Sequence, residues 1–165
     1  MAYQFNKIRV LLVEDNSHMR KLLKALLEAV GVREIVEAHD GGLAWMAMKK
    51  DPVDFALIDW EMYPVDGLEL VRKIRTEPDS PNPFLPIIMV TGHTERSRVL
   101  KARDLGVTEF LAKPVSAQSL SQRIEELIER PRPYIRTREF FGPDRRRGRK
   151  AAGYIGPERR EQQGA

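Results

Sequence analysis

The sequence predicts an α/β fold built on a five-stranded, doubly wound parallel sheet. Three observations support this prediction. Short runs rich in leucine and β-branched residues occur five times in the first 129 residues, and such runs are typical of strands buried on both faces. Each run is followed by a segment with apolar residues at helical spacing. Regular alternation of strands and helices, joined by right-handed crossovers, places helices on both faces of a parallel sheet.

The first half of the pattern has clear boundaries. It comprises a strand within residues 7–15, a helix ending at Gly31, a strand at 34–38 and a helix at 42–50. Asn16 or Ser17 is suited to cap the first helix, because both side chains can accept a hydrogen bond from the helix N-terminus. Gly31 is a typical helix stop, and Asp51-Pro52 ends the second helix.

The second half repeats the alternation three times. It comprises strands at 54–60, 87–91 and 109–114 and helices at 67–75, 96–106 and 116–129. The turn-rich stretch "EPDSPNPFLP" ends the third helix, Gly106 ends the fourth and Ser116 caps the fifth. We therefore predict one folded domain over residues 5–129.

Residues 130–165, here called the tail, have a different composition. "RPRPY" favours extended backbone, and no apolar periodicity follows it. The tail holds 11 Lys or Arg and 4 Asp or Glu, a net charge of +7, whereas residues 1–129 hold 17 basic and 20 acidic side chains, a net charge of −3. This composition predicts a mostly disordered, arginine-rich tail with an anionic partner.

The composition also narrows the class of protein. The chain has no cysteine, which excludes disulfides and thiolate metal sites. No N-terminal stretch is apolar for long enough to be a signal peptide or a membrane span. We therefore expect a soluble cytoplasmic protein, with no membrane partner.

Polar side chains gather where the predicted strands end. These residues are Glu14, Asp15, Asp59, Thr91 and Lys113. In an open parallel sheet, ligands bind beyond the carboxyl ends of the strands. Three carboxylates packed together repel one another unless a cation binds, and hard oxygen ligands suit Mg²⁺. The hydroxyl and the ammonium can hold the oxygens of a phosphoryl group, so we predict Asp59, the central carboxylate, as the phosphoryl acceptor.

These motifs resemble the receiver domain of bacterial response regulators, which has the CheY-like, flavodoxin-like fold. "VED" matches the acidic pair, "LIDWEMYPVDG" the segment around the phosphorylated aspartate, "VTGH" the threonine and "FLAKP" the lysine with its proline. The resemblance implies phosphorylation of Asp59, contact of Thr91 and Lys113 with the phosphoryl group, and a cis bond before Pro114. It also implies an aromatic switch at Phe110.

The resemblance further implies how the domain works. Mg²⁺ would be bound by Glu14, Asp15, Asp59 and the backbone carbonyl of Glu61. The protein would serve two-component signalling with a sensor histidine kinase or a phosphotransfer protein as its partner. It would not be an enzyme, beyond accepting a phosphoryl group on Asp59 and releasing it by autodephosphorylation. Because the tail is too short to form a helix-turn-helix domain with its own core, output must come from the receiver surface or the tail.

The tail contains one seven-residue pattern twice. "FFGPDRR" at residues 140–146 is matched fourteen residues later by "YIGPERR" at 154–160. Arginine pairs can bind phosphate or guanine edges, an acid can accept hydrogen bonds from guanine, and an aromatic ring can stack on a base. Gly-Pro forms the turn that brings these groups together. Two units therefore suit a symmetric guanine dinucleotide such as cyclic di-GMP.

The receiver followed by this tail resembles the Cle family of CheY-like cyclic di-GMP effectors. The resemblance implies output on the flagellar motor switch, motility or surface behaviour. The predicted cyclic di-GMP ligands are Phe140, Asp144, Arg145, Arg146, Arg147, Tyr154, Glu158, Arg159 and Arg160. Two alternatives remain open from the residues alone: a phosphorelay shuttle or sink with an inert tail, and a small regulator whose tail binds RNA or DNA. The matched acids argue against nucleic acid, since they repel a phosphate backbone.

Overall fold

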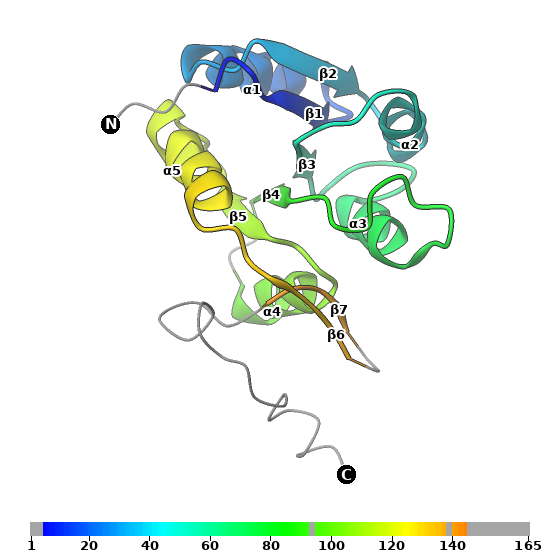
Figure 1. Cartoon of the computed structure of the whole chain (residues 1–165). Helices are drawn as coiled ribbons and strands as arrows, with labels where there is room; N and C mark the ends of the chain where they lie inside the picture. Colours follow the sequence, from blue (N-terminus) through cyan, green and yellow to red (C-terminus); the bar gives the residue numbers. More distant parts are fainter. Residues whose placement is uncertain (1–4, 93–94, 138–139, 145–165) are drawn as a thin grey trace.

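The protein is described by a computed structural model over residues 5–92, 95–137 and 140–144. Its main feature is a five-stranded parallel sheet with the strand order β2-β1-β3-β4-β5 (Figure 1). The strands are β1 (Arg9–Val13), β2 (Glu34–Ala38), β3 (Phe55–Asp59), β4 (Ile87–Thr91) and β5 (Glu109–Ala112). The helices are α1 (Ser17–Ala29), α2 (Gly41–Lys50), α3 (Gly67–Thr76), α4 (Arg96–Asp104) and α5 (Ala117–Glu129). The predicted doubly wound fold is confirmed.

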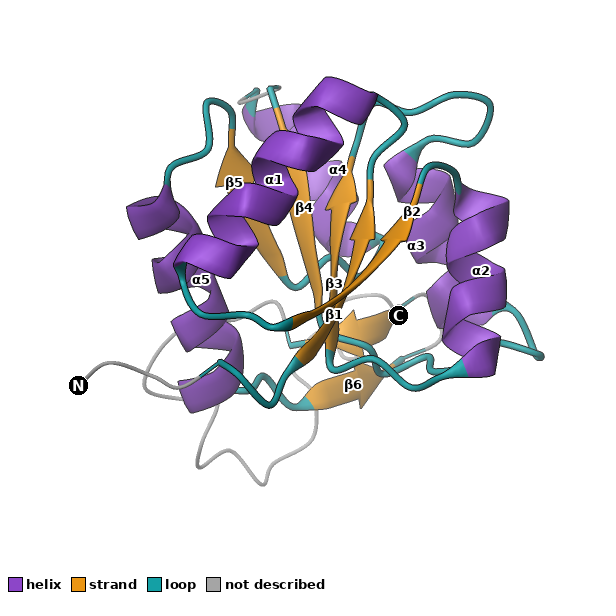
Figure 2. Cartoon of the chain, turned by 90° about the horizontal axis from the view of Figure 1, so that it is seen from above, coloured by secondary structure: helices purple, strands orange, loops and turns teal. Residues whose placement is uncertain are grey.

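Each face of the sheet has its own hydrophobic core. α1 and α5 cover one face, and their buried leucine and isoleucine side chains pack against alternate residues of the central strands. α2, α3 and α4 cover the other face with a second cluster that includes Trp60 (Figure 2). β3 and β4 are buried along their whole length. This double coverage explains why their sequences are continuously apolar.

The helix boundaries agree with the capping signals. The Asn16 side chain accepts a hydrogen bond from the Met19 N–H at 2.9 Å, and Ser116 accepts one from the Ser119 N–H at 3.1 Å. Gly31 follows α1 with a φ of 107°, a left-handed conformation that glycine adopts without strain.

The register of the sheet brings the strand ends together. Val13 pairs with Ile58, and Asp59 pairs with Val90. On the next strand, Thr91 pairs with Ala112. The residues at and just after these positions therefore lie along one edge of the sheet, as the sequence predicts.

Ordered structure continues beyond residue 130, which corrects the prediction of a mostly disordered tail at this point. β6 (Tyr134–Arg136) and β7 (Phe141–Pro143) form an antiparallel pair, here called the hairpin. It lies where β4 and β5 begin, at the end of the sheet opposite the acids (Figure 2). Strands of three residues are too short to show periodicity in a sequence. Residues 145–165 lie outside the described residues.

A buried arginine joins the hairpin to the receiver. Arg75, on α3, is 4% exposed. Its Nε and Nη2 donate to the carbonyl oxygen of Gly106 at 3.1 and 2.9 Å, and Nη1 donates to that of Pro83 at 2.8 Å. Its guanidinium carbon lies 5.2 Å from the centroid of the Tyr134 ring. Arg75 therefore connects α3, the turn before β5 and the hairpin.

A second connection is an ion pair on β5. Glu109, whose side chain is 4% exposed, receives Arg132 Nη2 at 3.2 Å, and Arg123 Nη1 of α5 lies 3.8 Å away. Arg132 Nη1 also reaches the carbonyl oxygen of Asp144 at 3.5 Å. The segment between α5 and the hairpin is thus held to β5 by a largely buried charge pair.

Among the described residues, no helix is long and apolar enough to cross a membrane.

Candidate functional site

Three carboxylates meet at the carboxyl ends of β1 and β3. Glu14 and Asp15 follow β1, and Asp59 is the last residue of β3. One oxygen from each lies within 4.8 Å of one from each of the others. Glu14 and Asp59 are buried, whereas Asp15 is exposed. The structure therefore brings together the three acids that the sequence places at strand ends, with one side of the cluster open to solvent.

Backbone amides fix the orientation of each carboxylate. The Asn16 N–H donates to Glu14 Oε1 at 3.0 Å, and the Tyr63 N–H donates to Asp15 Oδ2 at 3.1 Å. The Glu61 N–H donates to Asp59 Oδ1 at 3.2 Å. These bonds hold the acids in place and partly offset their mutual repulsion.

One oxygen of the cluster has no donor among the described residues. Glu14 Oε2 is buried without a hydrogen-bond partner. Burial, followed by a hydrogen bond with Asp59, raises the pKa of Glu14 from 4.5 to about 9, although the Asn16 N–H acts in the opposite direction. Such a carboxylate is stable when a proton or a cation occupies its free side. An all-oxygen donor set with an unpartnered buried oxygen and an exposed acid fits Mg²⁺.

Lys113 and Thr91 complete the site from the neighbouring strands. Lys113 follows β5, and its Nζ lies 3.1 Å from Asp59 Oδ2. Its side chain is 30% exposed, while that of Asp59 is 3% exposed. Thr91 ends β4 and is buried. The predicted cis bond between Lys113 and Pro114 is present.

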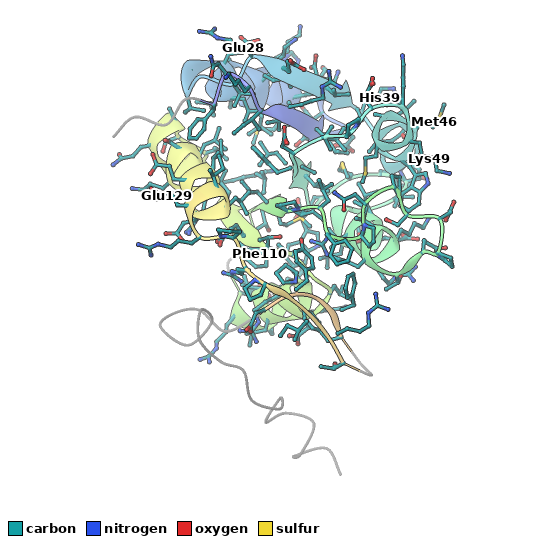
Figure 3. The ribbon with its side chains drawn as sticks, viewed as in Figure 1. Glu28, His39, Met46, Lys49, Phe110 and Glu129 are labelled. Atoms are coloured by element: carbon teal, nitrogen blue, oxygen red, sulfur yellow. The ribbon has the colours of Figure 1, made fainter. Side chains whose placement is uncertain are left out.

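Phe110 lies three residues before the lysine on β5 and is half-buried (Figure 3). It packs against the core on the α2–α4 face of the sheet. Its role as a switch stays a prediction, as does metal binding by the carbonyl of Glu61. The N–H of the exposed Glu61 donates to Asp59 Oδ1.

Gly67 packs closely against the backbone of Asp59 and Trp60. Its N–H donates to the carbonyl oxygen of Trp60 at 2.8 Å. A Cβ added to Gly67 would overlap the carbonyl oxygen of Asp59 and lie 3.0 Å from Trp60 Cα. The close approach of α3 to the end of β3 therefore requires glycine, which explains the glycine that the sequence shows in this turn.

Two supporting contacts were not predicted from the sequence. Arg20 Nη1, on α1, donates to the carbonyl oxygen of Glu14 at 3.0 Å. The Tyr63 amide reaches Asp15 across 48 positions of the chain. An arginine on a helix surface and a backbone amide give no sequence signal of their own.

The tail residues predicted to bind a dinucleotide are only partly described. Phe140 and Asp144 are buried, at 7% and 3% exposure, which differs from the accessible groups that the sequence suggests. Outside the described residues lie Arg145, Arg146, Arg147, Tyr154, Glu158, Arg159 and Arg160. Their role stays a prediction.

Known proteins are similar in sequence to this chain. The chain matches the response regulator receiver domain over residues 10–125. It is 35% identical over 123 residues to the chemotaxis protein CheY of Pseudomonas aeruginosa, covering 74% of this chain and 98% of that protein. It is 32% identical over 123 residues to CheY-3 of Vibrio cholerae, covering 74% and 93%.

Solved structures give the same result. The chemotaxis protein CheY4 of Vibrio cholerae has a TM-score of 0.67 and 27% identity, covering 73% of this chain and 98% of that one. The receiver domain of a sensor histidine kinase from Pseudomonas aeruginosa, solved with magnesium coordinated in its active site cleft, has a TM-score of 0.62 and 28% identity, covering 72% and 94%. With the fold, the acidic cluster and these similarities in agreement, the chain belongs to the response regulator receiver domain family.

Proposed function

We propose that the protein is a CheY-type response regulator that accepts a phosphoryl group on Asp59. The observation that carries this proposal is the contact of 3.1 Å between Lys113 Nζ and Asp59 Oδ2 inside an acidic cluster. A buried carboxylate with an adjacent ammonium is oriented for attack at phosphorus.

The transfer follows from this geometry. An oxygen of Asp59 forms a bond to phosphorus while the bond from phosphorus to the donor breaks, and the donor's leaving group departs with the bonding pair. Lys113 then pairs with a phosphoryl oxygen, and the Thr91 hydroxyl donates to another. Mg²⁺ bound by Glu14, Asp15 and Asp59 would neutralise charge on the phosphoryl oxygens.

The protein acts as a signalling component rather than as an enzyme on other substrates. Its phosphoryl group comes from a sensor histidine kinase or a phosphotransfer protein and is lost by hydrolysis. The similarity to chemotaxis proteins favours a downstream target at the flagellar motor switch.

The second part of the proposal is that the tail binds cyclic di-GMP. Its support is the repeated pattern at residues 140–146 and 154–160, together with the net charge of +7 in the tail. The acid of the second unit, Glu158, is not needed by a simple polyanion-binding segment and favours guanine recognition. The acid of the first unit, Asp144, is buried and does not add to this support. The hairpin holds the first part of the tail, up to Asp144, against the receiver, which favours a binding surface that is already formed.

Phosphorylation is tested on the full-length chain with a small phosphodonor and Mg²⁺. Asp59→Asn should abolish labelling, because the amide is a poor nucleophile for phosphorus. Asp66→Asn is the matched control, since Asp66 is an exposed acid that caps α3. Unchanged labelling of the Asp59 variant would contradict the assignment.

Ligand binding is tested by calorimetry with cyclic di-GMP, with GTP and single-stranded RNA as comparisons. Saturable binding of cyclic di-GMP alone supports the proposal. Equal binding of RNA would favour a nucleic-acid regulator, and no binding at all would favour a phosphorelay shuttle with an inert tail.

A further inference from the structure

An aromatic cluster at the hairpin is partly open to solvent. Phe84, in the loop before β4, is 52% exposed although it is large and apolar. Its ring centroid lies 5.3 Å from those of both Tyr134 and Phe141, at interplanar angles of 73° and 80°. These are edge-to-face contacts, which aromatic pairs favour. A ring already held by two neighbours loses little conformational freedom when a ligand stacks on it.

The loop that carries Phe84 is also fixed. The Phe84 N–H donates to Asn82 Oδ1 at 3.0 Å, and the preceding carbonyl, that of Pro83, accepts from Arg75 at 2.8 Å. These two groups belong to the peptide bond between Pro83 and Phe84, and the bond from Arg75 ties that peptide to α3. The exposed ring is presented by a firm support instead of a freely moving loop.

A cation lies beside the rings. The guanidinium carbon of Arg136, on β6, is 4.5 Å from the centroid of the Phe141 ring. Arg136 is exposed, and no acidic side chain among the described residues pairs with it. An arginine stacked on an aromatic ring keeps its outer face and its N–H groups available for a planar anion.

The two aromatic residues of the first repeat unit, Phe140 and Phe141, have different environments. Phe140 is buried, and its ring lies close to Gly142, where an added Cβ would be 3.0 Å from Phe140 Cζ. Phe141 lies on the other side of the strand, as alternation requires, and packs against Phe84 and Tyr134. The sequence suggests Phe140 as the stacking residue. In the structure, the residue of this unit that can contact a ligand is Phe141, because it is partly exposed.

We infer that Phe84, Phe141 and Arg136, here called the stacking platform, bind one guanine base of cyclic di-GMP. This inference rests on the proposed function of the tail. Two rings beside an arginine suit one planar base of a nucleotide that carries a phosphate. The surface that they form is too small to bind a helix. In the sequence, three consecutive arginines, residues 145–147, follow the hairpin.

The test uses calorimetry of cyclic di-GMP with the full-length chain and two variants. Phe84→Leu removes an aromatic face but keeps an apolar side chain, and Arg136→Gln removes the exposed cation. A stacked base contributes roughly 1–3 kcal/mol, and 1.4 kcal/mol corresponds to a factor of ten. We expect each variant to raise the Kd about tenfold.

Two matched controls separate stacking from general effects. Arg130→Gln makes the same change of charge at a side chain that is 77% exposed and pairs with Glu126 one turn earlier. Tyr63→Leu removes an aromatic ring that is 83% exposed at the acidic edge of the sheet. Both should change the Kd by less than about twofold, since neither touches the platform.

A spectroscopic readout reports the contact itself. In the wild-type complex, the guanine H8 resonance should move upfield through the ring current of Phe84, and Phe84→Leu should abolish that shift. Protection of the Asp144 N–H, which donates to the Pro133 carbonyl at 2.7 Å, reports whether the hairpin stays formed. If the leucine variant loses this protection, the Arg136 variant decides the question, because Arg136 is exposed and its replacement leaves the contacts of Phe84 with Tyr134 and Phe141 in place.

The outcomes distinguish this inference from the proposed function. Binding to the wild type with both variants within twofold of it would overturn the stacking platform and leave cyclic di-GMP binding in place. Failure of the wild type to bind would remove both.

Discussion

We predict that the contacts of Arg75 contribute most to holding the hairpin on the receiver. Arg75→Met keeps most of the apolar stem but removes three hydrogen bonds to the carbonyl oxygens of Gly106 and Pro83 and the contact with Tyr134. Hydrogen bonds to a charged group contribute about 1.5–3 kcal/mol each, so the three bonds together contribute roughly 5–9 kcal/mol.

The cost of burying the guanidinium offsets part of this sum. Burial lowers the pKa of Arg75, which shows that the charged form is poorly solvated in the folded state. The effective penalty for a buried ion is several kcal/mol, and methionine does not incur it. We therefore expect the free energy of unfolding to fall by about 3 kcal/mol, and the Tm by roughly 6–12 °C for a chain of this size.

The assay is urea unfolding combined with hydrogen exchange. Exchange of the Thr137 and Asp144 N–H groups, which donate to Phe140 and Pro133 at 2.7 Å, should accelerate in the Arg75→Met variant. Arg72→Met is the matched control, because Arg72 lies three residues earlier on α3 and is exposed. A loss below about 1 kcal/mol, or equal losses in the two variants, would refute the reasoning, because surface substitutions usually change stability by about 0.5 kcal/mol or less.

Three further predictions concern the acidic edge. Gly67→Ala should cost about 1–3 kcal/mol in urea unfolding, because its Cβ overlaps the carbonyl oxygen of Asp59; a neutral effect would show that α3 can shift. Asp15→Ala should remove the Mg²⁺-dependent quenching of the buried Trp60, and unchanged quenching would place the metal elsewhere. The raised pKa of Glu14 means that, without divalent cations, the folded state binds more protons than the unfolded state between pH 4.5 and about 9, so stability should fall as pH rises through this range. Glu14→Gln should flatten that slope in urea titrations with chelator, and an unaltered slope would assign it to another group.

The receiver site was predictable because its chemistry lies at the ends of strong sequence patterns. Asp59 and Thr91 each close a continuous apolar run, and parallel strands bring such ends to one edge. Lys113 follows the last strand in the same way. The register of the sheet then places Lys113 next to Asp59 without any further signal.

The hairpin was not predictable, because the residues that hold it belong to distant segments with other apparent roles. Arg75 stands in the last turn of a helix, where arginine usually faces solvent, yet it is buried. Phe84 lies in a proline-rich stretch that indicates only a turn. The contacts of these residues depend on how α3 and the loop before β4 meet in space, which local patterns do not encode.

The attachment of the hairpin to β5 has a thermodynamic consequence. β5 begins at Glu109, which pairs with Arg132, and ends one residue before Lys113, which pairs with Asp59. A strand of four residues spans only about 13 Å, so a single rigid element joins the phosphoryl site to the base of the tail. If a phosphoryl group on Asp59 changes the affinity of the tail for its ligand by some factor, linkage requires the ligand to change the equilibrium for phosphorylation by the same factor. Measuring the Kd of the ligand with and without a stable phosphoryl mimic therefore also measures how far the ligand changes that equilibrium.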